Sequence, residues 1–548
     1  MIFSLRTQNI PKESAAAMAR ALDRILTLRG LTLAGRDEAE YAVTVTLDGA
    51  LRDDRYLISP RAGGADLRAA SLSACFAALG KLLRLCTFDG KGGFTPAVQA
   101  VDFTPKDPVR GMYFATHFHN FYHNAPLEEV CTVIEDLALR GANSLLVWFD
   151  MHHYRSMKDP AAVAHAARLR AILAYANTVG MGGALTMLSN EGFAESPAHL
   201  RAEWAVQNGY FATPDSHYHV EICPNREGGV EEILRARREM LEAFCDLRID
   251  YVVYWPYDQG GCTCEKCAPW GAVGFTKLLP HFKALIREMM PHTRVIVSGW
   301  YFDRFTSGEW EGFLPQTGGE TFSDVPYLMS FFFRGEVPPA VRAYADTPAA
   351  IPQVSFPEIS MYSCTPWGGY GASLLTDFLE QTNCATEGLY RGGYPYSEGI
   401  FEDANKFIQL SYFTGEFPHA ADALREYVRF EFCCNDEELF EAIRRTETAL
   451  ARKRNRTEEG IVVHMQDTSD IEWVHRTVER YNASLPPAIT ASPKFRLFYL
   501  RAVIDRELMI HSGYARRSAL ATEAMREINR IYFADERTNP WVMAPAGL

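Results

Sequence analysis

The sequence predicts an α/β protein in which a (β/α)8 TIM barrel follows a small α/β domain and precedes an α-helical domain. Three observations predict this fold class. The chain has 548 residues, enough for about three or four domains, or fewer if one is a barrel. Eight short apolar runs alternate with helical patterns in its middle, and strand patterns disappear after them. The predicted domains are residues 1–105, 106–395 and 396–548.

The first domain is predicted from a βαββα pattern. Residues 1–7, 41–47 and 54–60 have the composition and alternation of paired strands. Residues 13–30 and 66–86 have the apolar spacing of amphipathic helices. Segments rich in glycine and proline follow the second helix, so a domain boundary is expected there.

The barrel is predicted from strand–helix units that repeat along the middle of the chain. Its helical segments include 126–141 and 230–247. The eight predicted strands are 110–116, 143–149, 182–189, 250–256, 294–300, 326–333, 352–360 and 384–391. A ninth short strand, 217–223, is assigned to a long insertion after the third barrel strand. From residue 396 onward the spacing is helical, so no strand is predicted in the last domain.

Composition and charge exclude several classes of partner. The chain is 47% hydrophobic and 22% charged, as in ordinary globular proteins. A formal net charge of −13 argues against nucleic acid or an anionic membrane, because phosphates would be repelled. No apolar run reaches about 18 residues, so no membrane span is predicted. No secretory signal is visible, which favours a cytoplasmic protein, or a secreted one if a signal was removed. A homodimer is left open.

Polar and aromatic side chains follow the predicted barrel strands. In barrel enzymes the loops at the carboxyl ends of the strands build the active site, so these side chains are the candidate site. The polar candidates are His117, His119, Asp150, His152, Glu191, Asp258, Tyr301, Glu358, Arg391, Tyr396 and Glu398. The tryptophans of the set are Trp148, Trp255 and Trp300.

Carboxylates mixed with tryptophans favour glycoside chemistry on a carbohydrate substrate. Cleavage needs two acidic groups around an oxocarbenium-like transition state, and burial against aromatic rings raises the pKa of one carboxyl so that it can donate a proton. We predict Asp258 and Glu358 as the catalytic pair, and the other candidates as substrate-binding residues. Glu191 and Glu398 are reserve acids. The alternative is that each acid only caps a helix or pairs with an arginine such as Arg391.

Two segments resemble known glycoside hydrolases. FAALGKLLRLC (76–86) resembles the helix that docks the N-terminal domain on the barrel in family 20 β-N-acetylhexosaminidases and family 67 α-glucuronidases. VRGMYFATHFHNF (109–121) resembles the first barrel strand of family 20. The resemblance covers the chain by architecture. It implies a hydrolase that removes a terminal sugar, either an amino sugar such as GlcNAc or GalNAc or, alternatively, a glucuronic acid.

The sequence departs from the family 20 pattern at the fourth strand. Family 20 enzymes place Asp-Glu there: the Asp holds the acetamido group of the substrate and the Glu is the general acid. This chain has Asp258-Gln259, and a glutamine amide cannot donate a proton as an acid. The resemblance therefore implies that Asp258 works with an acid from another strand. Glu358 stands where a family 67-like inverting enzyme supplies a carboxylate.

Four cysteines form a candidate metal site. Cys262, Cys264 and Cys267 have the spacing C-x-C-x2-C, and Cys223 ends the short inserted strand. Three or four thiolates at such spacing can hold a tetrahedral zinc ion, and the alternatives are reduced thiols that pack the loop or a disulfide. If zinc binds, sulfur fills its ligand positions, so the ion is structural and catalysis requires no cofactor.

Two rival functions of other classes remain. Five histidines lie in THFHNFYH (116–123) and DMHH (150–153), and H-x-H after a first barrel strand is typical of metal-dependent hydrolases, with His117 and His119 as ligands. That class also needs histidines after the fifth and sixth strands, which this chain lacks. The second rival is a carbohydrate-binding barrel without catalysis, since Gln259 replaces an acid.

Overall fold

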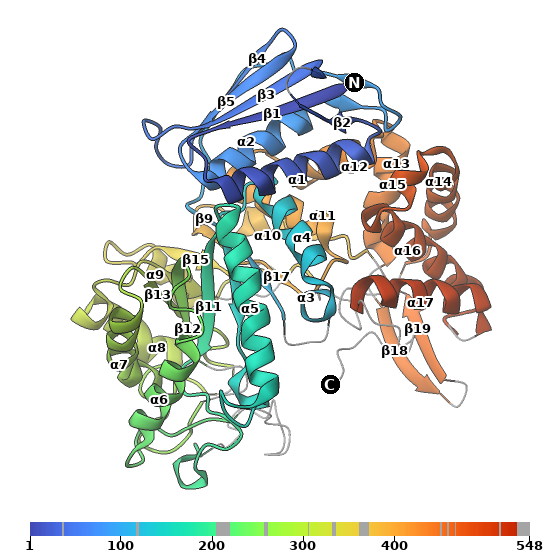
Figure 1. The fold of residues 1–548 in the computed structure, drawn as a ribbon. Helices are drawn as coiled ribbons and strands as arrows, with labels where there is room; N and C mark the ends of the chain where they lie inside the picture. Colours follow the sequence, from blue (N-terminus) through green and yellow to red (C-terminus); the bar gives the residue numbers. More distant parts are fainter. Residues whose placement is uncertain are drawn as a thin grey trace.

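The structure is a computed structural model of the chain. It describes residues 1–35, 38–116, 120–203, 220–256, 261–304, 306–330, 336–360, 372–449, 452–457, 460–465, 467–514 and 517–533. These residues form a mixed sheet with two helices, an eight-stranded parallel barrel and a group of C-terminal helices (Figure 1). The predicted fold class is confirmed. None of the described helices is long and apolar enough to cross a membrane.

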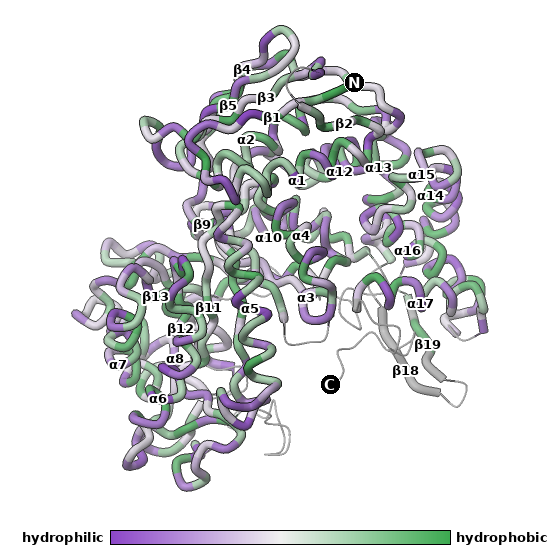
Figure 2. Tube along the Cα trace, viewed as in Figure 1, coloured by the Kyte–Doolittle hydropathy of each residue, from purple (hydrophilic) through white to green (hydrophobic). Residues whose placement is uncertain are grey.

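The N-terminal part is a six-stranded mixed sheet in the order β2-β1-β3-β5-β4-β8. Two helices, α1 (Lys12–Leu28) and α2 (Leu72–Leu85), lie between this sheet and the barrel (Figure 1). Hydrophilic and hydrophobic residues alternate along α1 (Figure 2). The buried residues of this helix include Met18 and Leu22. The strands are β1 (Ile2–Gln8), β2 (Thr32–Leu33), β3 (Tyr41–Leu47), β4 (Tyr56–Arg61), β5 (Gly64–Ala69) and β8 (Val101–Phe103), with a separate pair β6 (Thr87–Phe88) and β7 (Phe94–Thr95).

The helix predicted over 66–86 is wrong in its first turn. Those residues belong to β5, which pairs with β3 in parallel and with β4 in antiparallel register. Helix α2 begins only after Ser71, whose hydroxyl caps it by accepting from the amide of Ala74 at 3.1 Å. Burial alternates along β5, a strand pattern that the longer apolar helix beside it obscured.

Helix α2 packs directly on the barrel helix α4 (Leu127–Leu139). A Cβ at Gly80 of α2 would lie 1.9 Å from the carbonyl oxygen of Leu139, so any other residue would push the two helices apart. A Cβ at Gly180 would likewise lie 2.4 Å from the amide nitrogen of Ser73. Close backbone contacts therefore fix the N-terminal part against the barrel.

Eight parallel strands close into a barrel because the last, β16, pairs with the first, β9. The strands are β9 (Val109–Phe114), β10 (Ser144–Trp148), β11 (Gly182–Leu188), β12 (Ile249–Trp255), β13 (Arg294–Ser298), β14 (Leu328–Ser330), β15 (Gln353–Ser355) and β16 (Tyr390–Gly393). The first seven overlap their predicted positions. The helices between them are α3 (Phe121–Asn124), α4, α5 (Pro160–Thr178), α6 (Gly229–Leu241), α7 (Gly274–Met289), α8 (Glu309–Phe313), α9 (Pro339–Ala345) and α10 (Thr376–Ala385).

The predicted eighth strand, 384–391, overlaps β16 only at Tyr390 and Arg391, because α10 occupies its first residues and β16 starts later. A Cβ at Gly392 of β16 would lie 1.7 Å from the carbonyl oxygen of Val109 on β9. A strand this close to its neighbour must be built from glycine, so it has no apolar run to detect. The chain continues into β17 (Tyr396–Ser397), which also pairs with β9.

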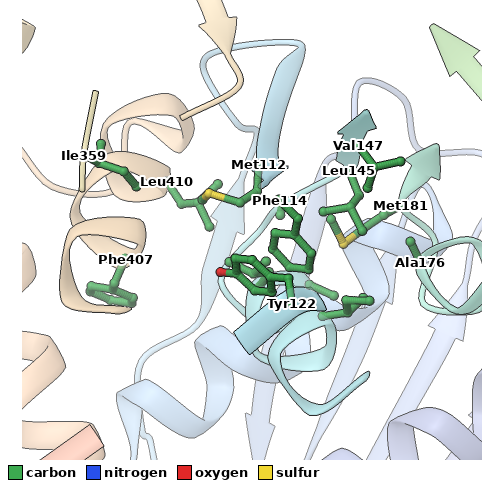
Figure 3. Close-up of a cluster of buried hydrophobic side chains, with 14 of the residues drawn as sticks. Met112, Phe114, Tyr122, Leu145, Val147, Ala176, Met181, Ile359, Phe407 and Leu410 are labelled. Atoms are coloured by element: carbon green, nitrogen blue, oxygen red, sulfur yellow. The ribbon is translucent and has the colours of Figure 1, made fainter. Parts of the chain in front are cut away.

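Alternate residues of the barrel strands belong to two separate cores. Met112, Phe114, Leu145 and Val147 belong to the core outside the barrel, where the ring of Phe114 stacks on Tyr122 of α3 at 3.8 Å (Figure 3). The residues that alternate with these point into the barrel and fill its interior. Near the carboxyl ends of the strands these inward-pointing residues are mostly aromatic. The second core includes Tyr113, Leu146, Trp148, Leu188, Val253, Trp255, Ile296, Val354, Phe356 and Tyr394.

The C-terminal part is mainly helical, but the prediction that it contains no strand is wrong. β17 and an antiparallel hairpin, β18 (Arg452–Thr457) with β19 (Gly460–Met465), follow the predicted boundary; RKRNRT has no apolar residue whose alternation could be detected. Of the inserted strand predicted over 217–223, residues 217–219 lie outside the described residues, and Glu221 and Ile222 form single bridges with Glu191 and Arg201. The helices are α11 (Asp403–Thr414), α12 (Ala420–Glu431), α13 (Glu437–Arg444), α14 (Ile471–Ser484), α15 (Pro487–Thr490), α16 (Pro493–Ile510) and α17 (Ala519–Phe533).

Candidate active site

Aromatic rings line the barrel interior where the strands end. The ring centroid of Trp255, at the end of β12, lies 5.1 Å from that of Trp300 and 5.1 Å from that of Phe356. On β17, Tyr396 stacks on Tyr113 of β9 at 5.4 Å. Phe356 joins the two pairs, because its ring also lies 5.4 Å from that of Tyr113. These rings form a continuous apolar floor at the carboxyl end of the barrel.

Glu358 stands beside this floor, three residues beyond β15. Its backbone forms a parallel bridge with Tyr396. Its Oε1 accepts hydrogen bonds from the amide of Ser360 at 2.8 Å and from the hydroxyl of the same residue at 3.0 Å. The half-buried side chain is thus held by its own loop. The structure therefore places this predicted catalytic carboxylate at the active-site end of the barrel.

Glu398 follows β17 and is 1% exposed. The Tyr396 hydroxyl donates to its Oε1, whereas its buried Oε2 accepts no hydrogen bond within the described chain. Burial raises the pKa of the Glu398 carboxyl well above its ordinary value near 4.5, and the negative charge of Glu358 adds to this shift. Its environment therefore favours the protonated form of the carboxyl, which can donate a proton.

A network of buried polar side chains holds the backbone that carries Glu398. Ser397 donates from its hydroxyl to Oε1 of Glu402 at 2.8 Å, and the amide of Gly399 donates to the same oxygen at 3.0 Å. The hydroxyl of Tyr122 lies 2.6 Å from that of Ser397. Lys406 places its Nζ 3.7 Å from Glu402 Oε1, and burial lowers the pKa of this ammonium group. The network fixes the chain just after β17.

The C-terminal helix α17 reaches this network through Tyr532. Its hydroxyl donates to the backbone carbonyl of Glu398 at 3.0 Å, and its ring stacks on Phe401 at 4.1 Å. A Cβ at Gly399 would lie 2.3 Å from the same ring. The last described helix therefore supports the segment that carries Glu398.

A second polar group follows β10 and β11. Nδ1 of His152 lies 2.6 Å from Oε1 of Glu191, which also accepts the His152 amide at 3.1 Å. Nδ1 of His153 is hydrogen-bonded to Asp150, and this bond raises the pKa of the imidazole. Nε2 of His165 on α5 lies 3.6 Å from the other Asp150 oxygen. Carboxylates thus orient the imidazoles on this side of the barrel.

Trp148 and Tyr301 complete the part of the predicted set that gathers at this end. The ring of Trp148 lies 5.7 Å from that of His152. Tyr301 follows β13 in a left-handed backbone conformation, with φ at 54°, and its ring lies 4.4 Å from that of Trp300. Both residues border the aromatic floor as predicted from their positions after strands.

Arg391 is not brought to this end of the barrel. Because the eighth strand starts later than predicted, Arg391 lies near its beginning, at the amino end of the barrel. There it is exposed and lies near Asp107, a carboxyl whose pKa burial raises to about 6. Three other predicted site residues, Asp258, His117 and His119, lie outside the described residues.

Sequence reasoning missed Tyr113, Phe356 and Tyr532. Alternation along the predicted strands could have found the first two, since both point into the barrel. No sequence signal identifies Tyr532, because it lies 134 residues from Glu398 and meets it only through the fold.

Four cysteines gather beside the loop after β12. The Sγ atoms of Cys223, Cys262, Cys264 and Cys267 all lie within 4.8 Å of one another. None of the four forms a disulfide. Hydrogen bonding with Cys267 lowers the pKa of the Cys262 thiol to about 5. The cluster can hold a structural metal ion such as zinc.

No family model matches the sequence, and no curated protein matches it. Solved structures of glycoside hydrolases are similar. A family GH115 4-O-methyl-α-glucuronidase with specificity for decorated arabinogalactans has a TM-score of 0.62 over 98% of this chain and 77% of its own, at 8% identity. A GH89 protein from Clostridium perfringens, in complex with its substrate GlcNAc-α-1,4-galactose, has a TM-score of 0.60 over 95% of this chain and 64% of its own, at 11% identity.

A GH20 exo-β-N-acetylglucosaminidase from Vibrio harveyi, in complex with N-acetylglucosamine, has a TM-score of 0.53. The match covers 77% of this chain and 72% of that chain, at 13% identity. A GH138 enzyme that targets pectin rhamnogalacturonan II is also similar, with a TM-score of 0.57 at 10% identity. At these identities the likeness shows the fold alone: this chain has a glycoside hydrolase-like TIM barrel.

Proposed function

We propose that this protein is a glycoside hydrolase that removes a terminal sugar from a glycan. The observation that carries the proposal is the proximity of Glu358 to Glu398, a carboxyl whose pKa is raised by burial, beside a floor of aromatic rings. Similar barrels in the GH20, GH89, GH115 and GH138 families support the reaction class.

An N-acetylated amino sugar is the proposed substrate. Two of the similar structures hold N-acetylglucosamine or a glycan that contains it, and the resemblance of the first barrel strand to family 20 points the same way. An α-glucuronide is the alternative, since the GH115 structure belongs to an α-glucuronidase. The indole faces of Trp255 and Trp300 are the proposed platform for the C–H face of the sugar ring.

We assign different catalytic roles to the neighbouring carboxyls of Glu358 and Glu398. Two carboxyls that share a site do not both ionise readily, so one of them retains a proton near neutral pH. Because burial raises the pKa of Glu398, we assign this residue as the proton donor to the leaving group. Glu358 is then the ionised base. Asp258, which follows β12 in the sequence, is assigned to orient or activate the nucleophile, either water or the acetamido group of the substrate.

We infer that hydrolysis needs no metal ion and that any metal held by the cysteines is structural. Within the described residues, the cysteines are the one group of three or more potential metal ligands that meet. His152 and His153 are instead bonded to Glu191 and Asp150. Activity abolished by chelation and by His117→Ala, with the cysteine cluster intact, would favour a metal-dependent hydrolase.

A panel of aryl glycosides tests the proposal. The purified protein is given aryl GlcNAc, GalNAc and glucuronic acid in both anomeric forms, and the proton NMR spectrum of the first product shows whether configuration is retained or inverted. We expect release of the aryl group from an amino-sugar glycoside. Isothermal titration that shows sugar binding without hydrolysis of any panel member would contradict the proposal and indicate a binding protein.

A further inference from the structure

We infer that the four cysteines bind one zinc ion, which clips the loop after β12 to the insertion after β11. The metal assignment stands on the geometry of Cys223, Cys262, Cys264 and Cys267 alone. Only the expected effect of the ion on turnover rests on the proposed function.

The sulfur positions fit a tetrahedral metal. Zinc–sulfur bonds of about 2.3 Å place the sulfurs of a tetrahedral site about 3.8 Å apart. The Sγ of Cys223 lies 3.9 Å from that of Cys264 and 3.9 Å from that of Cys267. Cys262 completes the set, with every sulfur within 4.8 Å of the others. Four sulfurs in this arrangement select zinc or iron rather than harder ions.

An amide donor to one of the sulfurs is already in place. Nδ2 of Asn225 donates to Sγ of Cys267 at 3.0 Å and to the carbonyl oxygen of Lys266 at 3.0 Å. Its Oδ1 accepts from the ammonium group of Lys277 on α7, so the amide is oriented from both ends. Hydrogen bonds of this kind hold ligands in place around protein-bound metals.

The backbone around the cluster is built for close approach. At the start of α6, a Cβ on Gly229 would lie 2.1 Å from the carbonyl oxygen of Cys223. At the start of α7, a Cβ on Gly274 would lie 2.3 Å from the ring of Trp270. That indole donates to the carbonyl oxygen of Pro256 at 3.0 Å, directly after β12. Three of the four cysteines are buried within this packing.

The cluster joins two loops that lead to the candidate site. The amide of Ile222, next to Cys223, donates to the carbonyl oxygen of Asn190 at 2.8 Å, and Glu221 bridges to Glu191. Cys262, Cys264 and Cys267 instead follow β12 and come after Asp258 in the sequence. A bound zinc ion therefore ties the loop that bears Glu191 to the loop that bears Asp258.

Metal analysis of the purified protein tests the site directly. Protein prepared without chelators should contain about one zinc ion per chain, and a mercurial reagent that titrates the thiols should release it. Cobalt exchanged into the site should give the intense visible absorption of a tetrahedral thiolate complex. Cys264→Ser should lose the metal, whereas Cys245→Ser, which changes an exposed cysteine outside the cluster, should retain it.

The wild-type measurements decide the question even if Cys264→Ser does not fold. The inference would be overturned if the protein, after incubation with zinc, kept four reduced thiols and bound no stoichiometric zinc. Disulfides in freshly prepared protein, or iron in place of zinc, would also overturn it. If the proposed function holds, zinc removal should lower kcat/KM by about tenfold, a loss of the size seen when metal-site support is removed, and reloading should restore it. If no glycoside is cleaved in any state, the proposed function fails while the metal result stands.

Discussion

Two clusters of carboxylates, which come within five residues of each other in the sequence at Glu398 and Asp403, are built in opposite ways. The junction cluster comprises Asp136, Asp403 and Glu431 with Arg24, Arg140 and Lys494. The mouth cluster comprises Glu358 and Glu398 with Tyr396. Arg140 binds Asp403 through two bonds of 2.8 and 2.9 Å, whereas no described lysine or arginine forms an ion pair with Glu398.

The two environments move carboxyl pKa values in opposite directions. Burial alone would raise the pKa of Asp403, but the guanidinium of Arg140 and the ammonium of Lys494 hold it well below its ordinary value. At Glu398 burial acts without a cation, so the pKa rises. A buried carboxylate that is fully paired holds parts of the protein together, and an unpaired one is available for proton transfer.

The junction cluster also borders a large cavity. A cavity of about 1110 Å3 lies among α1, α4, α11, α12 and α16 rather than at the barrel mouth, and its lining includes all six residues of the junction cluster. The direction of the carboxyl pKa shifts distinguishes the structural junction from the candidate catalytic site.

The largest expected effect is on turnover at the mouth cluster. Glu358→Gln removes the ionised base and should lower kcat by about 10³-fold, with the free energy of unfolding unchanged within about 1 kcal/mol. Asp258→Asn should act similarly. Aryl glycoside hydrolysis and urea denaturation measure the two quantities. Glu387→Gln, at an exposed position, is the matched control. Near-normal turnover in both active-site variants would remove the assignment.

At the junction cluster we expect a substitution to lower stability and to leave turnover unchanged. Asp403→Asn leaves the buried guanidinium of Arg140 incompletely paired, so the protein should lose about 3 kcal/mol of unfolding free energy, while kcat per folded molecule stays unchanged. Urea denaturation with an activity assay on the folded fraction checks both. Asp346→Asn, an exposed change, should alter neither. A large loss of kcat in folded Asp403→Asn would show that the two clusters are not separate.

The pH dependence of stability should distinguish the clusters by sign. The Glu398 carboxyl has a raised pKa in the folded protein, so wild-type stability falls as pH rises from the unfolded value near 4.5 through the folded one, by at most about 1.4 kcal/mol per pH unit. Glu398→Gln removes this slope. Asp403 has a lowered pKa, so its contribution is present above about 3.8 and is lost as pH falls.

Urea denaturation at a series of pH values measures both slopes. Glu398→Gln should gain stability relative to wild type as pH rises, and Asp403→Asn should lose least at acid pH. An unchanged pH slope in Glu398→Gln would mean that this carboxyl is ionised in the folded protein.

The smallest expected effect concerns the support from α17. Tyr532→Phe removes one hydrogen bond to the Glu398 carbonyl and should lower the unfolding free energy by about 1 kcal/mol. Because Tyr532 positions Glu398, the alkaline limb of the pH–rate profile should also shift. Tyr481→Phe removes a hydroxyl bonded to Asp436 and is the control. Equal pH–rate profiles in the two variants would limit Tyr532 to a purely structural role.

The sequence predicted the features that depend on local pattern. Seven barrel strands were found because apolar runs alternate with helices, and Glu358 because it follows one of them. The eighth strand was misplaced because close packing on Val109 requires Gly392, and this error carried Arg391 to the wrong end of the barrel. The raised pKa of Glu398 and the contact from Tyr532 were not predictable, because both depend on burial and contacts between distant segments.

Infrared difference spectroscopy of the carboxyl groups at pH 7 tests the central claim most directly. The account predicts a band from a neutral carboxyl in the wild-type protein that disappears in Glu398→Gln and persists in Asp403→Asn. A wild-type spectrum without that band, or a band that survives in Glu398→Gln, would contradict the assignment of Glu398 as a buried proton donor.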